Sequence, residues 1–497
     1  MATAATSDSK DPDDLINSVT SFGKYQLLLV VTLLWGNIVD TSNIVFMVFG
    51  GATAKHCPSP PPPTPSNASN GTSCPAGEAY VFSSMAQDLG LGAEPERLAY
   101  LTTIQLIGAL FGALLGGFLS DKLGRRYNTW FWLASEILLG SLSTLANSWS
   151  IMMAFRFFIG FSTGGYDASV IIYLMEWVDA RTRLVMQNAL MCINSVAFVW
   201  LSFLAYLTRG QGWRVLALVS NLQGLPCLLA FYFLAETPRW LLLNGHTQAA
   251  VQAMKKSVAW SGWKVDVENC DWGAYHDKLK AEAGPQTSYL DLLRGRQLTL
   301  RILMVAISFF VCGLCGYAFV FNVGNLVGNI FLNFAILGFL NVVAAIILSG
   351  ADRCFFLGRR LVHQVSMIGV LVFVGLMILI YWLQAEVEFP ALLVSAAMLG
   401  SMFSFPLWTV CGLYSGELFP TELRNKSSGV GTTASILGGI LSPILLTLFV
   451  PDQPSTHSVP FVILLCAVGV NAVLAWFLLP ETRGKLTEDD EIAQNST

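Results

Sequence analysis

The sequence predicts an all-α membrane protein with twelve transmembrane helices in two six-helix bundles and both termini in the cytoplasm. Three observations support this fold class: few charged residues, apolar stretches of membrane-spanning length, and charged clusters that recur in the second half of the chain. Of the 497 residues, 12% are charged and 54% are hydrophobic, whereas a soluble domain usually carries about 25% charged residues. So few charges cannot cover the surface of the soluble domains that this length would otherwise suggest. The net charge of −4 also offers no basic footprint for nucleic acid.

The apolar stretches set the span boundaries, because about 20 apolar helical residues cross ~30 Å of hydrocarbon. The first 24 residues contain no apolar segment behind a basic start, so we expect the first span to act as an uncleaved insertion signal. The twelve expected spans are 27–50, 98–120, 128–146, 151–174, 185–208, 213–235, 299–321, 325–349, 363–384, 389–414, 427–450 and 458–479.

The lysines and arginines predict the orientation, since basic residues gather on the cytoplasmic side of membrane proteins. With both termini inside, 23 of the 28 basic residues fall on that side. Lys55, Arg97, Arg209 and Arg214 lie outside, and Arg156 lies within a span.

The segment 51–97 is therefore expected to be an extracellular glycosylated loop. Asn67 and Asn70 each begin an Asn-x-Ser/Thr acceptor sequence for glycosylation. Cys57 and Cys74 lie in the same segment, and an oxidising compartment favours a disulfide between them. The alternative is two free thiols.

Acidic and basic residues recur in register at the predicted cytoplasmic helix ends of the two halves. The offsets between corresponding residues are 231 to 234 after spans 2 and 8, 241 after spans 4 and 10, and 245 after spans 6 and 12. Three such pairs in the same order indicate a duplicated chain with the solute path between its halves. The expected organisation is a cytoplasmic N-terminal segment at 1–26, an N-terminal six-helix bundle at 27–235, a cytoplasmic connector at 236–298, a C-terminal six-helix bundle at 299–479 and a cytoplasmic tail at 480–497.

Each recurring cluster places a carboxylate near arginines at a helix end, where partial desolvation strengthens an ion pair. We expect such pairs to latch the two halves together on the cytoplasmic side, so that breaking them is part of opening inward. The alternative is that the basic residues only fix the topology, which would leave the recurring Asp and Glu unexplained. The candidate gating residues are Asp121, Arg125, Arg126, Glu176, Arg181, Arg183, Glu236, Arg239, Asp352, Arg359, Arg360, Glu417, Arg424, Glu481 and Arg483.

Several of these segments resemble the major facilitator superfamily. Residues 117–126 are similar to its signature between spans 2 and 3, and residues 236–242 to an element of its sugar and organic-ion branches. The resemblance implies the major facilitator fold, alternating access by a rocker-switch, and a central cavity lined by spans 1, 2, 4, 5, 7, 8, 10 and 11. The segments 175–177, 213–216, 322–333 and 416–425 resemble the organic cation, anion and carnitine transporter family, a solute carrier family 22-like group, which implies small organic ions or zwitterions as substrates.

The sequence departs from that family at two positions that select the charge of the substrate. In span 8, Asn341 aligns where cation carriers have an acidic residue. In span 11, Ile436 stands where cation carriers have Asp and anion carriers have Arg. Because both positions are neutral here, neither preference can be carried over from the resemblance.

Ionisable residues within the spans are functional candidates, because each costs about 3 kcal/mol to place at mid-bilayer. Asp40 shares a helical face with Asn37 in span 1, where it would attract a cation, carry a proton or form a polar bridge to a neighbouring helix. Asp167 in span 4 is expected to line the pathway or to pair with an arginine. Arg156 is expected to anchor the structure, and Glu136 in span 3 to pack against a neighbour or face lipid.

Aromatic and amide side chains supply further candidates for substrate contacts. Tyr317 and Trp408 would stack on a quaternary ammonium, the alternative being ordinary packing. Amides would fix the orientation of a bound solute through hydrogen bonds. The candidate substrate-binding residues are Asn37, Asp40, Gln105, Tyr166, Asp167, Asn194, Gln223, Tyr317, Asn322, Asn341, Trp408 and Ile436.

These observations predict a plasma-membrane secondary transporter of small organic ions or zwitterions, organic cation- or carnitine-like, with H+ or Na+ as candidate coupling ions and the lipid bilayer as its surroundings. The alternatives are a non-transporting receptor or scaffold that retains the fold, and a sugar or nutrient carrier of the same superfamily. No nucleophile–base pair, metal-ligand cluster or phosphate loop appears at usable spacing, so an enzyme, a cofactor and a metal are not expected.

Overall fold

The computed structural model describes residues 12–52, 83–91, 95–263, 265–267, 272–282, 288–355, 358–385, 388–448 and 458–481. Every regular element in these ranges is a helix. Eleven helical stretches of the described chain are long and apolar enough to cross a membrane. The predicted all-helical membrane architecture is therefore confirmed, although the count of twelve spans is not.

The N-terminal half contains the helices that correspond to the first six expected spans. The first expected span is divided into two helices at Phe46, and the sixth at Gly224. The helices are α1 (Pro12–Val19), α2 (Lys24–Val45), α3 (Met47–Gly50), α4 (Met85–Asp88), α5 (Pro95–Leu123), α6 (Arg125–Leu142), η1 (Ser143–Leu145), α7 (Trp149–Glu176), α8 (Ala180–Leu207), α9 (Trp213–Leu222) and α10 (Leu225–Ala230).

Short helices follow within the expected connector, and six long helices form the C-terminal half. The connector contains α11 (Pro238–Leu243), α12 (Thr247–Ser261), α13 (Trp272–Glu282) and η2 (Tyr289–Leu293). The C-terminal half contains α14 (Arg296–Asn322), η3 (Val323–Asn325), α15 (Ile330–Phe355), α16 (Arg359–Trp382), α17 (Pro390–Glu417), α18 (Thr421–Leu448) and α19 (Val459–Leu478).

The helix α6 accounts for the difference between eleven and twelve spans. It coincides with the third expected span and packs along α7 within the N-terminal half. Its 18 residues include Arg125, Arg126 and Glu136, so the helix is too polar to be recognised as a membrane span by composition. A twelfth crossing at α6 remains a prediction.

Local sequence signals begin and end the long helices. Ser148 Oγ accepts a hydrogen bond from the backbone N–H of Ile151 at the start of α7. Asp179 Oδ1 accepts one from Thr182 at the start of α8. Such caps satisfy N–H groups that have no partner within the first turn of a helix.

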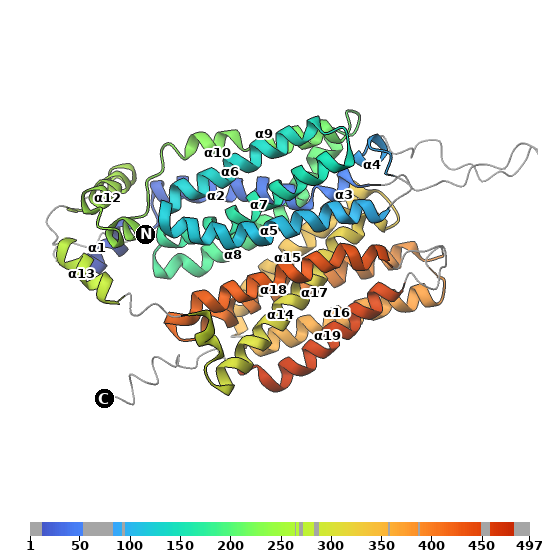
Figure 1. Ribbon diagram of the computed structural model, residues 1–497. Helices are drawn as coiled ribbons and strands as arrows, with labels where there is room; N and C mark the ends of the chain where they lie inside the picture. Colours follow the sequence, from blue (N-terminus) through green and yellow to red (C-terminus); the bar gives the residue numbers. More distant parts are fainter. Residues whose placement is uncertain are drawn as a thin grey trace, which may run out of the picture.

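The molecule has two distinct ends along the helix axes. Figure 1 shows α1, α12 and α13 together at the left end of the bundle and α4 at the right end. These are called the α1 end and the α4 end below. The blue to green helices of the N-terminal half lie above the yellow to red helices of the C-terminal half (Figure 1). Helices α5 and α8 of the first half contact α18 and α15 of the second.

Among the described residues, the apolar core that joins the two halves lies toward the α4 end. One cluster of buried side chains there joins residues of both halves, such as Phe49 and Leu201 with Val323 and Phe334. Toward the α1 end, the N-terminal half has its own cluster, which includes side chains of α1, α12 and α13. The C-terminal half has another separate cluster at that end. The halves are therefore fastened together by apolar contacts at the α4 end.

Glycines allow α5 and α7 to pack at backbone contact distance. A Cβ atom on Gly112 would lie 2.0 Å from the carbonyl oxygen of Phe161, and one on Gly164 would lie 2.0 Å from that of Ala109. Backbone atoms cannot move aside as a flexible side chain can. Small residues at such interfaces let helices approach closely where no hydrophobic effect drives their association.

We predict that Gly112→Ala destabilises the protein by about 1–3 kcal/mol, because the added methyl group forces α5 away from α7. The measurement is the thermal melting temperature and the monodisperse yield in detergent. Gly117→Ala on the same helix is the matched control, since a Cβ there meets nothing within 4 Å. Equal melting temperatures for the two variants would contradict the packing argument.

Candidate functional site

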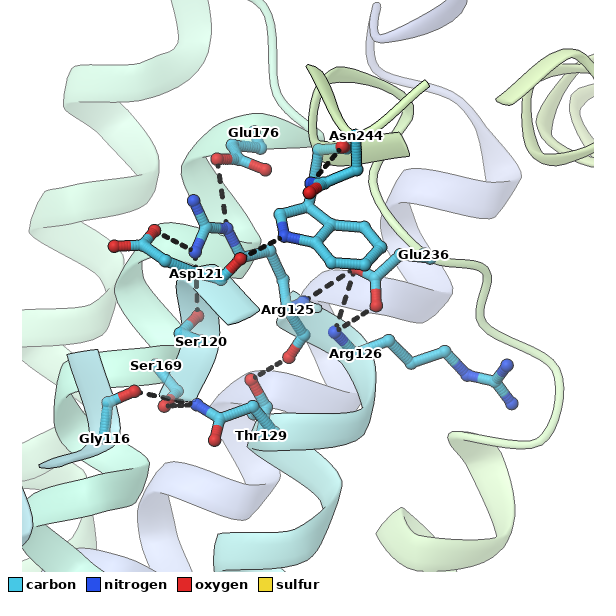
Figure 2. A network of polar contacts seen from close by, with 12 residues as sticks. Gly116, Ser120, Asp121, Arg125, Arg126, Thr129, Ser169, Glu176, Glu236 and Asn244 are labelled. Carbon is cyan, nitrogen blue, oxygen red and sulfur yellow. Dashed lines mark hydrogen bonds and ion pairs between the residues drawn. The ribbon is translucent and has the colours of Figure 1, made fainter. Parts of the chain in front are cut away.

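A buried arginine joins three helices at the α1 end of the N-terminal half. Arg125 Nη1 lies 2.6 Å from Asp121 Oδ1, and its Nε lies 3.3 Å from Glu176 Oε1. Figure 2 shows this guanidinium between the two carboxylates, which come from α5 and α7. Trp240 Nε1 donates to the backbone carbonyl of Asp121 at 2.8 Å and ties α11 to the same point.

Glu236 holds the start of α6 through the backbone. Its Oε1 accepts the N–H of Arg125 at 2.9 Å, and its Oε2 accepts that of Arg126 at 3.0 Å (Figure 2). Gly124 precedes the helix with φ +98°, and a Cβ there would lie 2.4 Å from Glu236 Oε2. Burial raises the pKa of Glu236, and the backbone donors oppose that rise. The carboxylate thus satisfies N–H groups at the helix N-terminus, where negative charge is favourable.

The C-terminal half repeats this arrangement at the equivalent place. Glu481 Oε1 accepts the N–H of Arg359 at 2.8 Å, and Oε2 accepts that of Arg360 at 3.2 Å. Arg359 Nη2 lies 3.5 Å from Glu417 Oε1. A Cβ on Gly358 would lie 2.2 Å from Glu481 Oε2. Gly358 therefore leaves room for this glutamate, as Gly124 does for Glu236 in the first half.

The second arginine of each pair also has the same role in both halves. Arg126 Nη2 donates to the carbonyl of Phe231 at 2.9 Å, and Arg360 Nη2 donates to the carbonyl of Trp476. Phe231 and Trp476 are separated by 245 residues, as Glu236 and Glu481 are. The duplication read from the sequence is therefore a duplication of contacts.

The described ion pairs of these clusters close within each half and not across the junction between the halves. Arg125 pairs with Asp121 and Glu176, and Arg359 pairs with Glu417. The expected latch between the halves differs from these contacts, because each carboxylate is supplied by a neighbouring helix of the same half. Among the other candidate gating residues, Arg183 and Arg239 are exposed and Arg424 is half-buried, while Arg483 and the side chains of Arg181 and Asp352 lie outside the described part of the chain.

Carboxyl groups from three helices gather inside the N-terminal half. Asp40 and Asp167 lie within hydrogen-bonding reach of each other, and both lie close enough to Glu136 for electrostatic interaction. Glu136 is fully buried and accepts a hydrogen bond from Asn43 Nδ2 at 2.8 Å. The expectation that Glu136 faces lipid is therefore wrong: α6 turns this face toward α2. Its packing against a neighbouring helix is as expected.

Several predicted binding residues are bridges between helices. Asn37 Nδ2 donates to Asn194 Oδ1 at 2.5 Å and joins α2 to α8. Gln105 Nε2 donates to the carbonyl of Asn43 at 2.8 Å, and Gln105 Oε1 accepts from Arg156 at 3.4 Å. Tyr166 is fully buried, and its hydroxyl donates to the carbonyl of Leu33 at 3.2 Å. Gln105 and Tyr166 thus serve helix packing in this structure.

The remaining predicted residues are spread over both halves. The backbone carbonyl of Gln223 accepts a hydrogen bond from Trp35 Nε1 at 3.0 Å. Its side-chain Oε1 accepts one from Trp200 Nε1 at 2.5 Å. Asn341 Oδ1 accepts from Ser401 Oγ at 3.3 Å within the C-terminal half. Asn322 is buried at the end of α14, and Ile436 is half-buried on α18.

Asp167, Tyr317 and Trp408 form the arrangement best suited to bind a charged ligand. Asp167 keeps an exposed side chain although it lies within the helix bundle. It stands nine residues before Glu176, and Trp408 stands nine residues before Glu417. The two repeats therefore carry a carboxylate and an indole at equivalent depths.

Tyr317 on α14 links these two side chains. Its ring lies 6.4 Å from that of Trp408 at an interplanar angle of 79°. It also lies close enough to Asp167 for electrostatic interaction. A Cβ on Gly439 of α18 would lie 2.6 Å from the Tyr317 ring, so that glycine makes room for it. A carboxylate near the Tyr317 ring, which itself packs edge-on against Trp408, favours a positively charged ligand.

An aromatic cluster at the α4 end was not recognised from the sequence. The Phe49 ring lies 5.6 Å from that of Phe331 and 5.4 Å from that of Phe334. Phe198 stacks on Phe334 at 5.1 Å. These rings come from α3, α8 and α15 and close the junction between the halves. Phe331 lies in the segment 322–333, which already stood out by resemblance.

The segment 213–216 also acquires a structural role at the α4 end. Arg214 Nη1 lies 2.6 Å from Asp88 Oδ2, and Trp213 Nε1 donates to the same oxygen at 2.9 Å. These contacts fasten α4 to the start of α9. Asn67, Asn70, Cys57 and Cys74 lie outside the described residues.

A profile of the family described as "Sugar (and other) transporter" matches residues 73–492. "Solute carrier family 22 member 15-like" of Xenopus laevis is 30% identical over 400 residues, which cover 79% of this chain and 77% of the relative. "Solute carrier family 22 member 13" of Homo sapiens is 30% identical over 390 residues, covering 78% and 67%. "Organic cation transporter protein" of Drosophila melanogaster is 28% identical over 393 residues, covering 76% and 68%.

Among solved structures, the inward open conformation of the xylose transporter XylE from E. coli matches with a TM-score of 0.68 and 19% identity, covering 94% of this chain and 100% of that one. At this identity the match concerns the fold alone. The chain therefore belongs to the sugar (and other) transporter family, with solute carrier family 22 members among its relatives, and is a multi-pass membrane secondary transporter with the major facilitator fold.

Proposed function

We propose that this transporter moves small organic cations or zwitterions across the plasma membrane by alternating access. The observation that carries the proposal is the placement of Asp167, Tyr317 and Trp408. The carboxylate attracts the cationic group, and the two rings offer their negative faces to it. In a site of low dielectric, such an attraction is several times stronger than in water.

The source of the negative charge differs from the pattern that the family resemblance implied. Asn341 and Ile436 are neutral, so the C-terminal half carries no charge at these two positions. Its contribution to the proposed site is the aromatic wall of Tyr317 and Trp408. The carboxylate of Asp167 belongs to α7 of the N-terminal half. In this proposal the substrate is held between a negative wall and an aromatic wall that belong to opposite halves.

We further propose that the α1 end faces the cytoplasm and that the structure is the inward-facing state. The basic residues support this orientation. The joined apolar core at the α4 end and the two separate cores at the α1 end support a molecule closed toward the outside. The arginine clusters then keep each half rigid while the halves rock. The loop 51–97, with glycosylation at Asn67 and Asn70 and a disulfide between Cys57 and Cys74, would be extracellular.

A coupled H+ or Na+ would bind at Asp40 and Asp167, whose neighbouring carboxyl groups repel each other when both are ionised. Replacement of external Na+ by Li+ at constant pH separates these ions, because a Na+-coupled carrier is then expected to lose its uptake and an H+-coupled carrier is not.

We predict that Asp167→Asn lowers kcat/KM for tetraethylammonium by roughly 10- to 100-fold, since it removes a charged partner of the cation. The measurement is saturable uptake of labelled tetraethylammonium and carnitine into vesicles, with glucose and p-aminohippurate as neutral and anionic comparisons. Asp277→Asn on the exposed face of α13 is the matched control. Unchanged cation uptake by Asp167→Asn, or saturable uptake of glucose alone, would exclude the proposed substrate class.

We predict that Phe334→Ala shifts the transporter toward the outward-facing state, because the ring is buried only when the α4 end is closed. The readout is modification of Ser202→Cys by a membrane-impermeant thiol reagent added outside intact cells, with the parent chain as background. Ser202 is buried at the contact between α8 and α15, where its hydroxyl donates to the carbonyl of Phe331. Labelling of Ser202→Cys should therefore become several-fold faster when this end opens.

The matched control is Phe373→Ala, whose ring stacks on Phe403 within the C-terminal half at 5.7 Å. It should leave the labelling rate of Ser202→Cys unchanged. Equal acceleration by both variants would indicate general loosening and would overturn the assignment of the closed end.

Double-mutant cycles should show ionic coupling within a half and none across the junction. Arg125→Gln combined with Glu176→Gln is expected to give a coupling energy of about 0.5–3 kcal/mol in the free energy of unfolding. Their side chains are only 10% and 15% exposed, so solvent screening is limited. Arg125→Gln combined with Glu417→Gln should be additive within about 0.5 kcal/mol. A coupling energy clearly above about 0.5 kcal/mol for Arg125 and Glu417 would contradict this prediction and would favour an ionic latch between the halves.

A further inference from the structure

A basic hollow lies at the α1 end of the C-terminal half, lined only by residues of this half and of the connector that precedes it. Its volume is about 420 Å³, and its lining includes Arg294, Arg296, Gln297, Arg301 and Pro420. It forms where η2 turns into α14, and α18 begins beside it. The proposed transport mechanism gives this hollow no role.

Three arginines give the hollow its positive charge. Arg294 Nε lies 3.0 Å from Asp291 Oδ1, but its side chain stays 82% exposed. Arg301 Nη1 donates to the carbonyl of Leu418 at 3.3 Å, which holds its guanidinium at the back of the hollow. Arg296 is exposed at the rim. Two of the three guanidinium groups are therefore open to a ligand from outside.

The N-terminus of α14 adds backbone donors to the same place. Gly295 precedes the helix with φ +87°, and no side chain caps the first turn. The first N–H groups of a helix have no partner within it and favour an anion. Phosphate oxygens suit both these donors and the planar fork of arginine.

An exposed apolar stripe of α14 begins at Arg296, the residue of this helix that the stripe shares with the hollow. Leu300, Leu303 and Ile307 follow Arg296 on one face of α14 and are 38%, 50% and 36% exposed. The spacing of four, three and four residues keeps all of them on one side of a helix. An acyl chain along this stripe would bring its headgroup to Arg296.

The turn η2 forms an apolar shelf beside the hollow. Leu292 is 1% exposed and anchors the turn in the protein, whereas Tyr289, Leu290 and Leu293 are 60%, 72% and 54% exposed. Side chains of this kind next to basic residues are typical of segments that lie in a membrane interface. The hollow is thus bordered by exposed apolar groups beside exposed basic groups.

We propose that this hollow binds the phosphorylated headgroup of an anionic lipid in the cytoplasmic leaflet, with its acyl chains along Leu300, Leu303 and Ile307. The leaflet assignment rests on the orientation given under Proposed function, whereas the binding itself does not depend on transport. A basic pocket at the cytoplasmic boundary of a membrane helix suits a phosphoinositide headgroup.

The test uses the purified full chain and measures its binding of dioctanoyl phosphatidylinositol 4-phosphate by native mass spectrometry. The double variant Arg294→Gln/Arg296→Gln is expected to weaken this binding by roughly 10- to 30-fold. Each arginine near an anionic surface contributes a factor of about three to six to the affinity. Both side chains are exposed, so the melting temperature should not change.

The matched control removes two exposed basic charges from the α1 end of the other half, Lys24→Gln/Lys122→Gln, and should bind as the parent does. The proposal is overturned if the arginine variant binds like the parent, or if phosphatidylcholine of the same chain length binds as tightly. Equal affinity for the soluble inositol 1,4-bisphosphate would assign the hollow to free phosphate compounds instead of a lipid. Loss of transport with lipid binding intact would overturn only the proposed function.

Discussion

The need to satisfy buried polar groups within each half shapes the α1 end of this protein. Glu236 and Glu481 each accept two successive backbone N–H groups from a helix that lies more than 100 residues earlier in the chain, with separations of 111 and 122 residues. Leaving such carboxylates or N–H groups without partners away from water would cost several kcal/mol each. Each contact therefore fastens the last part of a half to its third helix, and each half becomes a closed unit.

Closure of each half leaves mainly apolar contact between the two halves, to which Ser202 adds a hydrogen bond to the carbonyl of Phe331. The cluster at the α4 end contains Phe49, Phe198, Phe331 and Phe334, which interact through ring faces and edges. Such contacts have little directional preference, and separating them leaves no charge unpaired. In the alternating-access motion that we propose, the polar contacts would preserve each half, while the apolar contacts would be made and broken. This division of roles suits two rigid bodies that rock about a shared cavity.

The sequence predicted the duplication well because the charged residues recur at nearly constant offsets at the helix ends of both halves. The recurring Asp, Glu and Arg marked the helix ends correctly, but their partners depend on side-chain directions that spacing does not contain. Glu136 was misjudged for the same reason: the place of α6 in the bundle does not reveal that Asn43 faces it. The phenylalanines of the α4 end were missed because aromatic residues in an apolar span look alike until two helices from opposite halves meet. Asp167 and Trp408 had a stronger signal, since each stands nine residues before a glutamate of the repeated pattern.

The equivalence of Asp167 and Trp408 shows how a duplicated scaffold acquires an asymmetric site. The contacts that stabilise the halves are shared, down to Gly124 and Gly358 beside their glutamates. In the site that we propose, the residues that face the solute are not shared, because a path with identical walls would hold two charges or two indoles. A carboxylate opposite an indole gives one wall that neutralises a cation and one that accommodates its apolar groups. Since the two proposed walls belong to different halves, a change in their separation would weaken the contacts with the solute, and the motion that opens the path would also release the solute.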